Sequence, residues 1–291
     1  MRIANLAGRL VLIEGDHALD VESASEHRFG ADPAPIFGEW DALVDWARDI
    51  DVTTHSDAVT FAAAELGAPS PRPRQVIGVG LNYADHAAEA GLPIPEHPVV
   101  FTKFASSITG PDVDVRLPGD TVDWEAELVV VIGRGGRDIP ESEALERIAG
   151  YTVGQDLSER TVQWQGTPAQ FSIGKSFENF APTGPVIATL DEFADPDHLR
   201  VSTTIIGADG SETRVQDGAT DKLIFPIADL VSRLSAIVEL LPGDLIFTGT
   251  PPGVGAGMDP KRFLVAGETL VTQIEGIGEI TQRFFASAAV A

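Results

Sequence analysis

Residues 123–133 constrain this chain more than any other stretch of it. They read Asp-Trp-Glu-Ala-Glu-Leu-Val-Val-Val-Ile-Gly, an alternating pattern that becomes continuously apolar. That change is typical of a strand that runs from a cavity into a buried core. Because side chains two apart on a strand share a face, we expect Glu125 and Glu127 to point the same way. Their charges repel, so the pair requires a nearby cation or one protonated carboxyl group, unless it belongs to an ordinary solvated strand face.

Composition and charge exclude several classes of protein. With 291 residues, 43% of them apolar, the chain is long enough for one large domain or two modest ones. The longest apolar run, residues 128–132, is far shorter than the about 20 residues that a membrane span requires, and we expect no signal peptide. The lack of cysteine excludes disulfides and thiolate chemistry and suits a cytoplasmic protein. A net charge of −24 argues against nucleic acid as a partner.

A proline-rich linker at residues 68–73 is the clearest boundary in the sequence. Before it, residues 1–70 predict a small domain with a strand pair at 10–13 and 18–21. A helix follows around residues 40–47, where apolar side chains recur at helical spacing. No catalytic pattern occurs in this segment.

Beyond the linker, a short strand at 75–80 leads into a predicted helix at residues 83–90. His86 and Glu89 are three residues apart on that helix, so their side chains can touch. A carboxylate beside an imidazole fixes its tautomer and raises its basicity, which a general base needs, although such a pair can also be an inert surface contact. The glycines of the strand do not complete a nucleotide-binding G-x-G-x-x-G motif.

A third carboxylate and two lysines extend the pattern. Asp156 comes directly after a short strand at 151–155 and would turn the repelling glutamates into a cation cage. Oxygen ligands alone suit Mg²⁺, Mn²⁺ or Ca²⁺ rather than zinc. Lys103 lies in an apolar run and needs an anionic partner. Lys175 would offset the carboxylates or hold a substrate acid group, unless it is a solvated loop lysine.

The remaining segments supply the frame and an anion loop. Residues 140–149 predict a helix begun by proline and stopped by glycine, and residues 226–238 an amphipathic helix. Residues 199–206 and 212–215 predict a hairpin across Asp-Gly. The loop Thr-Gly-Thr-Pro-Pro-Gly-Val-Gly at 248–255 offers backbone donors and the Thr250 hydroxyl, an arrangement suited to an anion.

Together these motifs resemble the fumarylacetoacetate hydrolase family, in its short bacterial form, over residues 75–285. Six blocks in order carry the resemblance: Gly-Leu-Asn-Tyr-Ala-Asp-His-x-x-Glu (80–89), Asp-Trp-Glu-Ala-Glu (123–127), Gln-Asp (155–156), Gly-Lys-Ser-Phe (174–177), Pro-Thr-Gly-Pro (182–185) and the loop at 248–255. Residues 253–282 are also similar to the hydrolases of 2,4-diketo-3-deoxy sugar acids such as rhamnonate or fuconate derivatives.

The resemblance implies an α+β fold that is predominantly β. Its catalytic domain would be a mixed β-roll or sandwich over residues 74–291, preceded by the small α+β domain of residues 1–70. It also implies that the protein is a homodimer.

For the site, the resemblance implies three groups of residues. Glu125, Glu127 and Asp156 match the ligands of Mg²⁺ or Mn²⁺, with Ca²⁺ as a substitute. His86 and Glu89 match the water-activating pair, on a lid that often orders only with ligand, and Lys175 matches the lysine near metal and substrate. The predicted substrate contacts are Tyr83, Lys103, Gln163, Gly249 and Thr250. Residues 161–165 differ from the arginine-containing sequence that is common in the family. This difference affects the part of the pocket that would bind the distal group of the substrate.

The implied function is cleavage of the C–C bond of a 2,4-dioxo acid, an acylpyruvate, to pyruvate and a second carboxylic acid. His86 would take a proton from the attacking water. Oxaloacetate decarboxylase, hydratase and hydroxymuconate-type isomerase reactions use a similar site, and no residue in the sequence separates them. A non-enzymatic β domain that binds a divalent cation would explain the three carboxylates but not His86, Glu89, Lys175 or the Thr250 loop.

Overall fold

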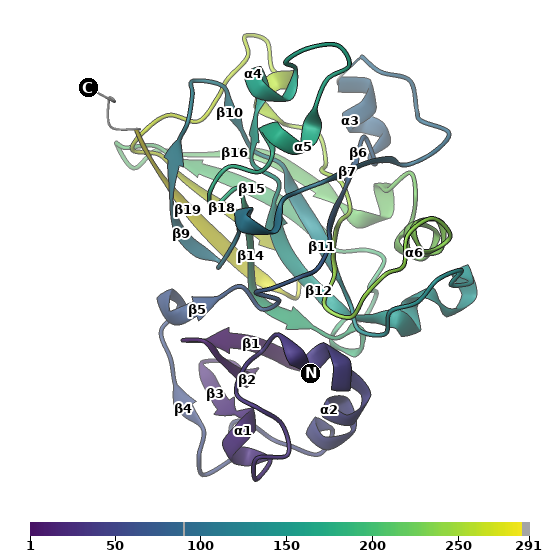
Figure 1. Ribbon diagram of the computed structural model, residues 1–291. Helices are drawn as coiled ribbons and strands as arrows, with labels where there is room; N and C mark the ends of the chain where they lie inside the picture. Colours follow the sequence, from purple (N-terminus) through teal and green to yellow (C-terminus); the bar gives the residue numbers. More distant parts are fainter. Residues whose placement is uncertain (90, 287–291) are drawn as a thin grey trace.

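The computed structural model describes residues 1–89 and 91–286 and is dominated by three β-sheets with short helices around them (Figure 1). The predicted class, α+β and predominantly β, is confirmed. The largest sheet runs in the order β4-β3-β2-β1-β14-β12-β11-β17-β6-β7, with β5 on β1 and β8 on β14. Its strands are β1 Arg2–Leu6, β2 Arg9–Glu14, β3 His17–Asp20, β4 Val59–Thr60, β5 Leu66–Gly67, β6 Val76–Gly80, β7 Val99–Thr102, β8 Ile108–Thr109, β11 Ala126–Ile132, β12 Ile148–Gln155, β14 Ala181–Ala188 and β17 Leu245–Phe247.

A five-stranded sheet, in the order β16-β15-β18-β19-β9, lies against the middle of the large sheet, where β15 and β18 contact β11 and β12. Its strands are β9 Asp112–Leu117, β15 Arg200–Ile206, β16 Glu212–Ala219, β18 Thr269–Ile274 and β19 Gly278–Ala286. The third sheet is a two-stranded pair, β10 Val122–Asp123 and β13 Ser158–Glu159. The predicted hairpin is confirmed, because β15 and β16 pair antiparallel.

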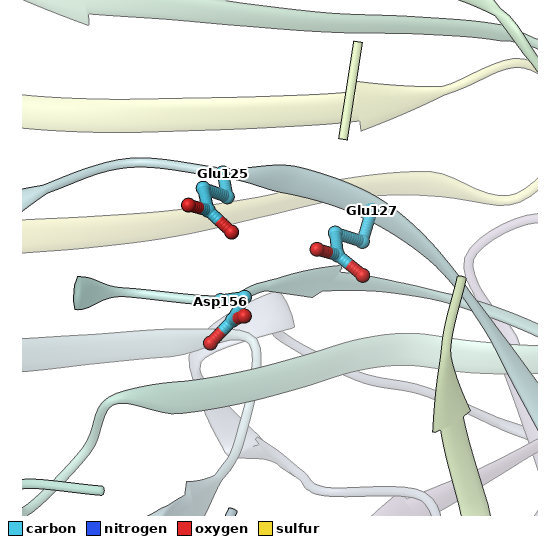
Figure 2. A group of neighbouring side chains, drawn as sticks. All are labelled: Glu125, Glu127 and Asp156. Carbon is cyan, nitrogen blue, oxygen red and sulfur yellow. The ribbon is translucent and has the colours of Figure 1, made fainter. Parts of the chain in front are cut away.

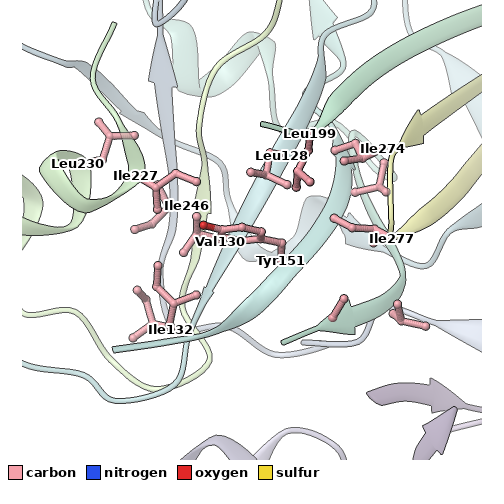
Figure 3. Close-up of a cluster of buried hydrophobic side chains, with 14 of the residues drawn as sticks. Leu128, Val130, Ile132, Tyr151, Leu199, Ile227, Leu230, Ile246, Ile274 and Ile277 are labelled. Carbon is pink, nitrogen blue, oxygen red and sulfur yellow. The ribbon is translucent and has the colours of Figure 1, made fainter. Parts of the chain in front are cut away.

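Strand β11 is buried on both faces, which explains its continuous apolar run. Leu128 and Val130 face the five-stranded sheet and pack with Tyr151 and Ile274 in one core cluster (Figure 3). Val129 belongs to a second cluster on the opposite face, which includes apolar residues from the N-terminal strands and α2. The strand that carries the glutamates is thus fixed from both sides.

The helices are short and lie at the margins of the sheets. The α-helices are α1 Val21–Ala24, α2 Trp40–Ala47, α3 Ala84–Glu89, α4 Arg160–Gln163, α5 Phe171–Gly174 and α6 Ile227–Ser235. The 3₁₀ helices are η1 Pro35–Glu39, η2 Ala63–Glu65, η3 Ala105–Ser107, η4 Glu141–Arg147, η5 Leu190–Glu192, η6 Thr220–Lys222 and η7 Gly255–Gly257. No helix within the described ranges has the length and apolar content that crossing a membrane requires.

Several predicted elements differ in their limits. The helix predicted at residues 140–149 is the shorter 3₁₀ helix η4, and its predicted end is wrong, because Ile148 and Gly150 pair with β11 as part of β12. The predicted helix at 83–90 is α3, and Ala90 lies outside the described residues. The amphipathic helix at 226–238 is the shorter α6.

The N-terminal segment joins the large sheet through one strand. β1 pairs antiparallel with β14, and β2 and β3 extend the sheet from there. Figure 1 shows this segment below the body of the molecule, on the side away from α3, α4 and α5. The division of the chain at residue 70 stays a prediction.

Candidate active site

The three predicted ligand carboxylates converge at the point where β11 begins and β12 ends. Glu125 immediately precedes β11 and Glu127 is its second residue, while Asp156 follows the last residue of β12. The Asp156 N–H donates to the Glu125 carbonyl oxygen at 2.9 Å, and this hydrogen bond holds the two backbone segments side by side. One carboxylate oxygen from each of the three residues lies within 4.8 Å of the other two (Figure 2).

Two buried lysines lie against these carboxylates. Lys175 Nζ donates to Glu125 Oε2 at 2.9 Å and to Asp156 Oδ2 at 2.6 Å, and its third hydrogen bond goes to the Ser158 hydroxyl. Burial would lower the pKa of Lys175, but the neighbouring carboxylates outweigh it and raise that pKa above its usual range. Lys103 Nζ reaches Asp156 Oδ1 at 2.5 Å, so the lysine predicted to need an anionic partner has one.

A third cation, Arg160, completes this charge network. Its guanidinium donates to Asp123 Oδ2 at 2.8 Å through Nε, and lies 2.8 Å from Glu125 Oε1. Burial would raise the pKa of Glu125, but the charges of Lys175 and Arg160 outweigh it and hold that pKa well below its usual range. Glu125 is therefore ionised, with a cation on each of its oxygens.

Glu127 is the exception in this network. It is 1% exposed, and no lysine, arginine or histidine among the described residues forms an ion pair with it. Its Oε2 accepts the Gly249 N–H at 2.8 Å. Burial, followed by the charges of Asp156 and Glu125, raises the pKa of Glu127 well above its usual range. The ionised form of Glu127 is therefore disfavoured unless a further positive charge lies beside it.

The donor set fits a divalent cation. Three buried carboxylates supply oxygen atoms only, which suits Mg²⁺, Mn²⁺ or Ca²⁺. A cation beside Glu127 would compensate the one carboxylate of these three that has no positive partner among the described side chains. Glu125, Glu127 and Asp156 are the residues that would hold it.

The predicted base, His86, lines the same cavity as Glu125 and Glu127. His86 Nδ1 is 3.1 Å from Glu89 Oε2, and the other oxygen of Glu89 accepts the Gly253 N–H at 2.9 Å. Glu89 thus links α3 to the loop that follows Thr250. With Nδ1 hydrogen-bonded to the carboxylate, His86 Nε2 is the ring nitrogen free to accept a proton.

One cavity of about 620 Å³ brings these groups together. Its walls include the predicted residues His86, Glu89, Glu125, Glu127, Gln163, Lys175 and Thr250. Asp156 is fully buried at the base of the cluster, behind this wall. Three predicted substrate contacts also lie behind it: Lys103 holds Asp156, Gly249 holds Glu127, and Tyr83 is 1% exposed.

The Thr250 hydroxyl is oriented by a buried amide. Gln216 Nε2 donates to Thr250 Oγ1 at 2.8 Å and to the carbonyl oxygen of Pro251 at 2.9 Å. Since Oγ1 accepts a bond from the chain, its own hydrogen is free to be donated into the cavity.

The sequence analysis missed Arg160 and Asp123. Residues 161–165 lack the arginine that is common in the family at this point. An arginine, Arg160, nevertheless lies one position earlier and lines the cavity. Its spacing of three from Gln163 was the available signal, because Arg160 also donates to Gln163 Oε1 at 2.9 Å across α4. Asp123 accepts the Gly255 and Ala256 N–H groups and so anchors the loop after Thr250.

Comparison with known proteins agrees with the resemblance. The family model described as fumarylacetoacetate (FAA) hydrolase, C-terminal, matches residues 75–285. The crystal structure of a Mycobacterium smegmatis protein, provisionally assigned as an HpcE protein, has 53% identity and a TM-score of 0.91, covering 99% of this chain and 100% of that one. The human mitochondrial oxaloacetate tautomerase is 42% identical over 239 residues, 81% of this chain and 73% of that protein.

A further solved structure is that of fumarylpyruvate hydrolase from Pseudomonas aeruginosa in complex with Mn²⁺ and pyruvate. It is 37% identical, with a TM-score of 0.65, covering 74% of this chain and 91% of that one. With the family model matching residues 75–285, the chain belongs to the fumarylacetoacetate hydrolase family.

Proposed function

We propose that this protein cleaves the C–C bond of a 2,4-dioxo acid, giving pyruvate and a second carboxylic acid. The observation that carries the proposal is that the His86–Glu89 pair faces the same cavity as Glu125, Glu127 and Thr250. A cation-binding β domain without activity would need neither the His86–Glu89 pair nor the Thr250 hydroxyl. The fumarylpyruvate hydrolase among the relatives supports the same reaction class.

A divalent cation, Mg²⁺ or Mn²⁺ with Ca²⁺ as a substitute, would be held by Glu125, Glu127 and Asp156. When bound, it supplies positive charge where negative charge develops on the oxygen atoms of the dioxo acid. The buried lysines hold these carboxylates in place, since Lys175 contacts Glu125 and Asp156 directly and Lys103 contacts Asp156.

His86 takes the proton of the attacking water at Nε2. Glu89 holds the ring by its Nδ1–H and stabilises the imidazolium that forms, while the Gly253 N–H fixes Glu89 in turn. General-base catalysis of this kind contributes about 10²–10⁴-fold to the rate. The hydroxide oxygen bonds to C4, the C3–C4 bond breaks, and its electron pair remains on C3. That carbon is then protonated to give pyruvate, and the C4 carbonyl leaves as a carboxylic acid.

The acid end of the substrate is positioned by the Thr250 loop. The free hydroxyl hydrogen of Thr250 donates to the carboxylate, and Gln216 keeps that hydroxyl in one orientation. Arg160 and Lys175 line the same cavity, and by pairing with its carboxylates they reduce the repulsion that an anionic substrate would meet near a chain of net charge −24.

Tautomerisation of a 2-oxo acid such as oxaloacetate is the second candidate, because the human relative with this activity is 42% identical. The same His86 would then move a proton between C3 and the enol oxygen, and no water would add. Oxaloacetate decarboxylation, hydration and hydroxymuconate-type isomerisation are further alternatives that share the carboxylate cluster.

Isotope labelling separates these reactions. The protein is incubated with acylpyruvates, fumarylpyruvate, 2,4-dioxo sugar acids and oxaloacetate in H₂¹⁸O, with Mg²⁺ and with EDTA. Hydrolysis predicts metal-dependent release of pyruvate and one ¹⁸O atom in the second acid. Exchange at C3 in D₂O without any cleavage would instead establish tautomerisation and refute the hydrolase proposal.

A homodimer and a cytoplasmic location stay predictions. Size-exclusion chromatography with light scattering tests the first, since a dimer doubles the 30.8 kDa mass of the chain. Cell fractionation tests the second.

A further inference from the structure

Three aromatic rings form a row along one wall of the cavity. Phe101 lies at the inner end, where Lys175 Nζ is 4.9 Å from its ring centroid. The Phe171 centroid is 6.0 Å from Phe101, and the Trp164 centroid is 5.3 Å from Phe171. Exposure is 8% for Phe101 and 58% for Trp164, so the row leads from the carboxylate cluster toward the mouth of the cavity.

Close backbone packing fixes the row in place. A Cβ on Gly78 of β6 would lie 2.3 Å from the Phe101 ring, so this glycine lets the ring lie directly on the strand. A Cβ on Gly174 would lie 2.6 Å from the Gln163 backbone nitrogen, so α5 packs tightly on α4. Phe171 begins α5 and Trp164 directly follows α4, so this contact sets the distance between the two rings.

Some of the polar groups that line the cavity are already engaged or balanced. Gln163 Oε1 accepts a hydrogen bond from Arg160, and so its carbonyl is occupied by the chain. Asp259 and Lys261 also line the cavity, and their side chains carry opposite charges. Apolar side chains line much of the rest of the cavity: Val79, Leu81, Leu92, Val254, Ala256 and Met258.

We propose that Trp164, with Phe171 and Phe101, forms the subsite for the acyl tail of the substrate and selects a flat, apolar tail such as an aromatic or conjugated acyl group. This inference rests on the proposed function. The pyruvyl end occupies the region of Glu125, Glu127 and Thr250, and the tail beyond C4 extends along the row of rings. Trp164 is then a specificity-determining residue.

The proposal separates two substrate classes that the sequence left together. A polyhydroxylated tail, as in a 2,4-dioxo sugar acid, would lose its hydrogen bonds to water against three rings and receive few in return. A flat apolar tail gains contact area and ring stacking there. Contacts of this size typically change substrate preference by about tenfold to a hundredfold.

The test compares kcat/KM for benzoylpyruvate and acetylpyruvate, which differ in the tail alone. We expect wild-type protein to prefer benzoylpyruvate, and Trp164→Ala to lower that preference ratio about tenfold. Trp164→Phe should retain most of the preference. Ile173→Ala is the matched control, because Ile173 is an apolar residue of the neighbouring α5 with a similar exposure of 56% but does not line the cavity. An unchanged ratio in Trp164→Ala, or a wild-type preference for acetylpyruvate, would overturn the proposal.

A binding measurement keeps this inference separate from the proposed reaction. Calorimetry with Mg²⁺ compares pyruvate with 2-oxo-4-phenylbutanoate, which carries the phenyl tail at the same spacing but has no C4 carbonyl to hydrolyse. Tighter binding of the phenyl compound that is lost in Trp164→Ala supports the subsite. If this holds while no acylpyruvate is cleaved, the C–C hydrolase proposal fails and the subsite stands. Equal binding of both compounds to wild-type protein refutes the subsite.

Discussion

Replacing Glu127 by Gln is the sharpest test of the carboxylate cluster. The amide keeps an oxygen that can accept the Gly249 N–H, now at 2.8 Å, and removes one charge from a side chain that is 1% exposed. Because Asp156 and Glu125 repel that charge and no described cation pairs with it, we expect the metal-free variant to be at least as stable as wild-type protein. This would be unusual for a buried substitution, since most of these destabilise.

Added metal should reverse the order of stability. A ligand at 100 times its dissociation constant stabilises the folded state by about 2.7 kcal/mol. At about 2 °C per kcal/mol for a chain of this size, wild-type protein should gain roughly 5 °C in Tm on adding Mg²⁺. Glu127→Gln should gain little, because one of the three ligands has lost its charge.

Thermal unfolding with EDTA, Mg²⁺ and Mn²⁺ measures both effects in one experiment. Glu178→Gln is the control, since Glu178 is exposed and does not line the cavity. This variant should show the full wild-type shift. A full Mg²⁺ shift in Glu127→Gln would refute the metal site. A metal-free variant that is less stable by more than about 2 kcal/mol would refute the argument that the charge of Glu127 is disfavoured.

Three further predictions follow from the same contacts. His86→Ala should lower kcat by about 10²–10⁴-fold and leave the Mg²⁺ shift in Tm unchanged, and near-normal turnover would exclude His86 as the base. Lys175→Met should destabilise the metal-free protein by about 3–5 kcal/mol in urea unfolding, because two buried carboxylates lose their shared partner, and a loss below 1 kcal/mol would contradict this. Arg9 lowers the pKa of Asp20 from 3.8 to about 2, so Asp20→Asn should cost about 1 kcal/mol at pH 7, after discounting for the exposure of the pair. This cost should shrink as the pH falls from about 4 through about 2, and a cost that keeps its full pH 7 value at pH 2 would rule out the ion pair as its source.

The sequence predicted those parts of the site that depend on local periodicity. The two-residue repeat of a strand places Glu125 and Glu127 on one face, and the helical spacing of three brings His86 to Glu89. Asp156 and the Thr250 loop stood out by residue type, and the family resemblance joined them to the glutamates although they come from distant segments. The roles of these residues stay proposals, but their convergence is a property of the fold.

The rest depended on tertiary contacts that no local pattern encodes. Arg160 pairs with Asp123 and Glu125 because β10 pairs with β13, which leads directly into α4, and a local pattern in this short polar segment does not reveal that pairing. The helix expected at residues 140–149 competes with strand pairing, and the hydrogen bonds of β12 prevail at Ile148. Lys103 was expected to touch the substrate, and its side chain instead lies beneath Asp156.

The two oxygen atoms of Glu89 give the amide of Gly253 a use as a reporter. One oxygen contacts His86 on α3, and the other accepts the Gly253 N–H at 2.9 Å. Any opening of α3 that carries Glu89 away must break that amide hydrogen bond at the same moment. The hydrogen-exchange rate of the Gly253 amide therefore measures how often α3 carries His86 out of the cavity, and the measurement needs no substrate. A ligand that holds α3 closed would slow that exchange by the same factor as it lowers the open population.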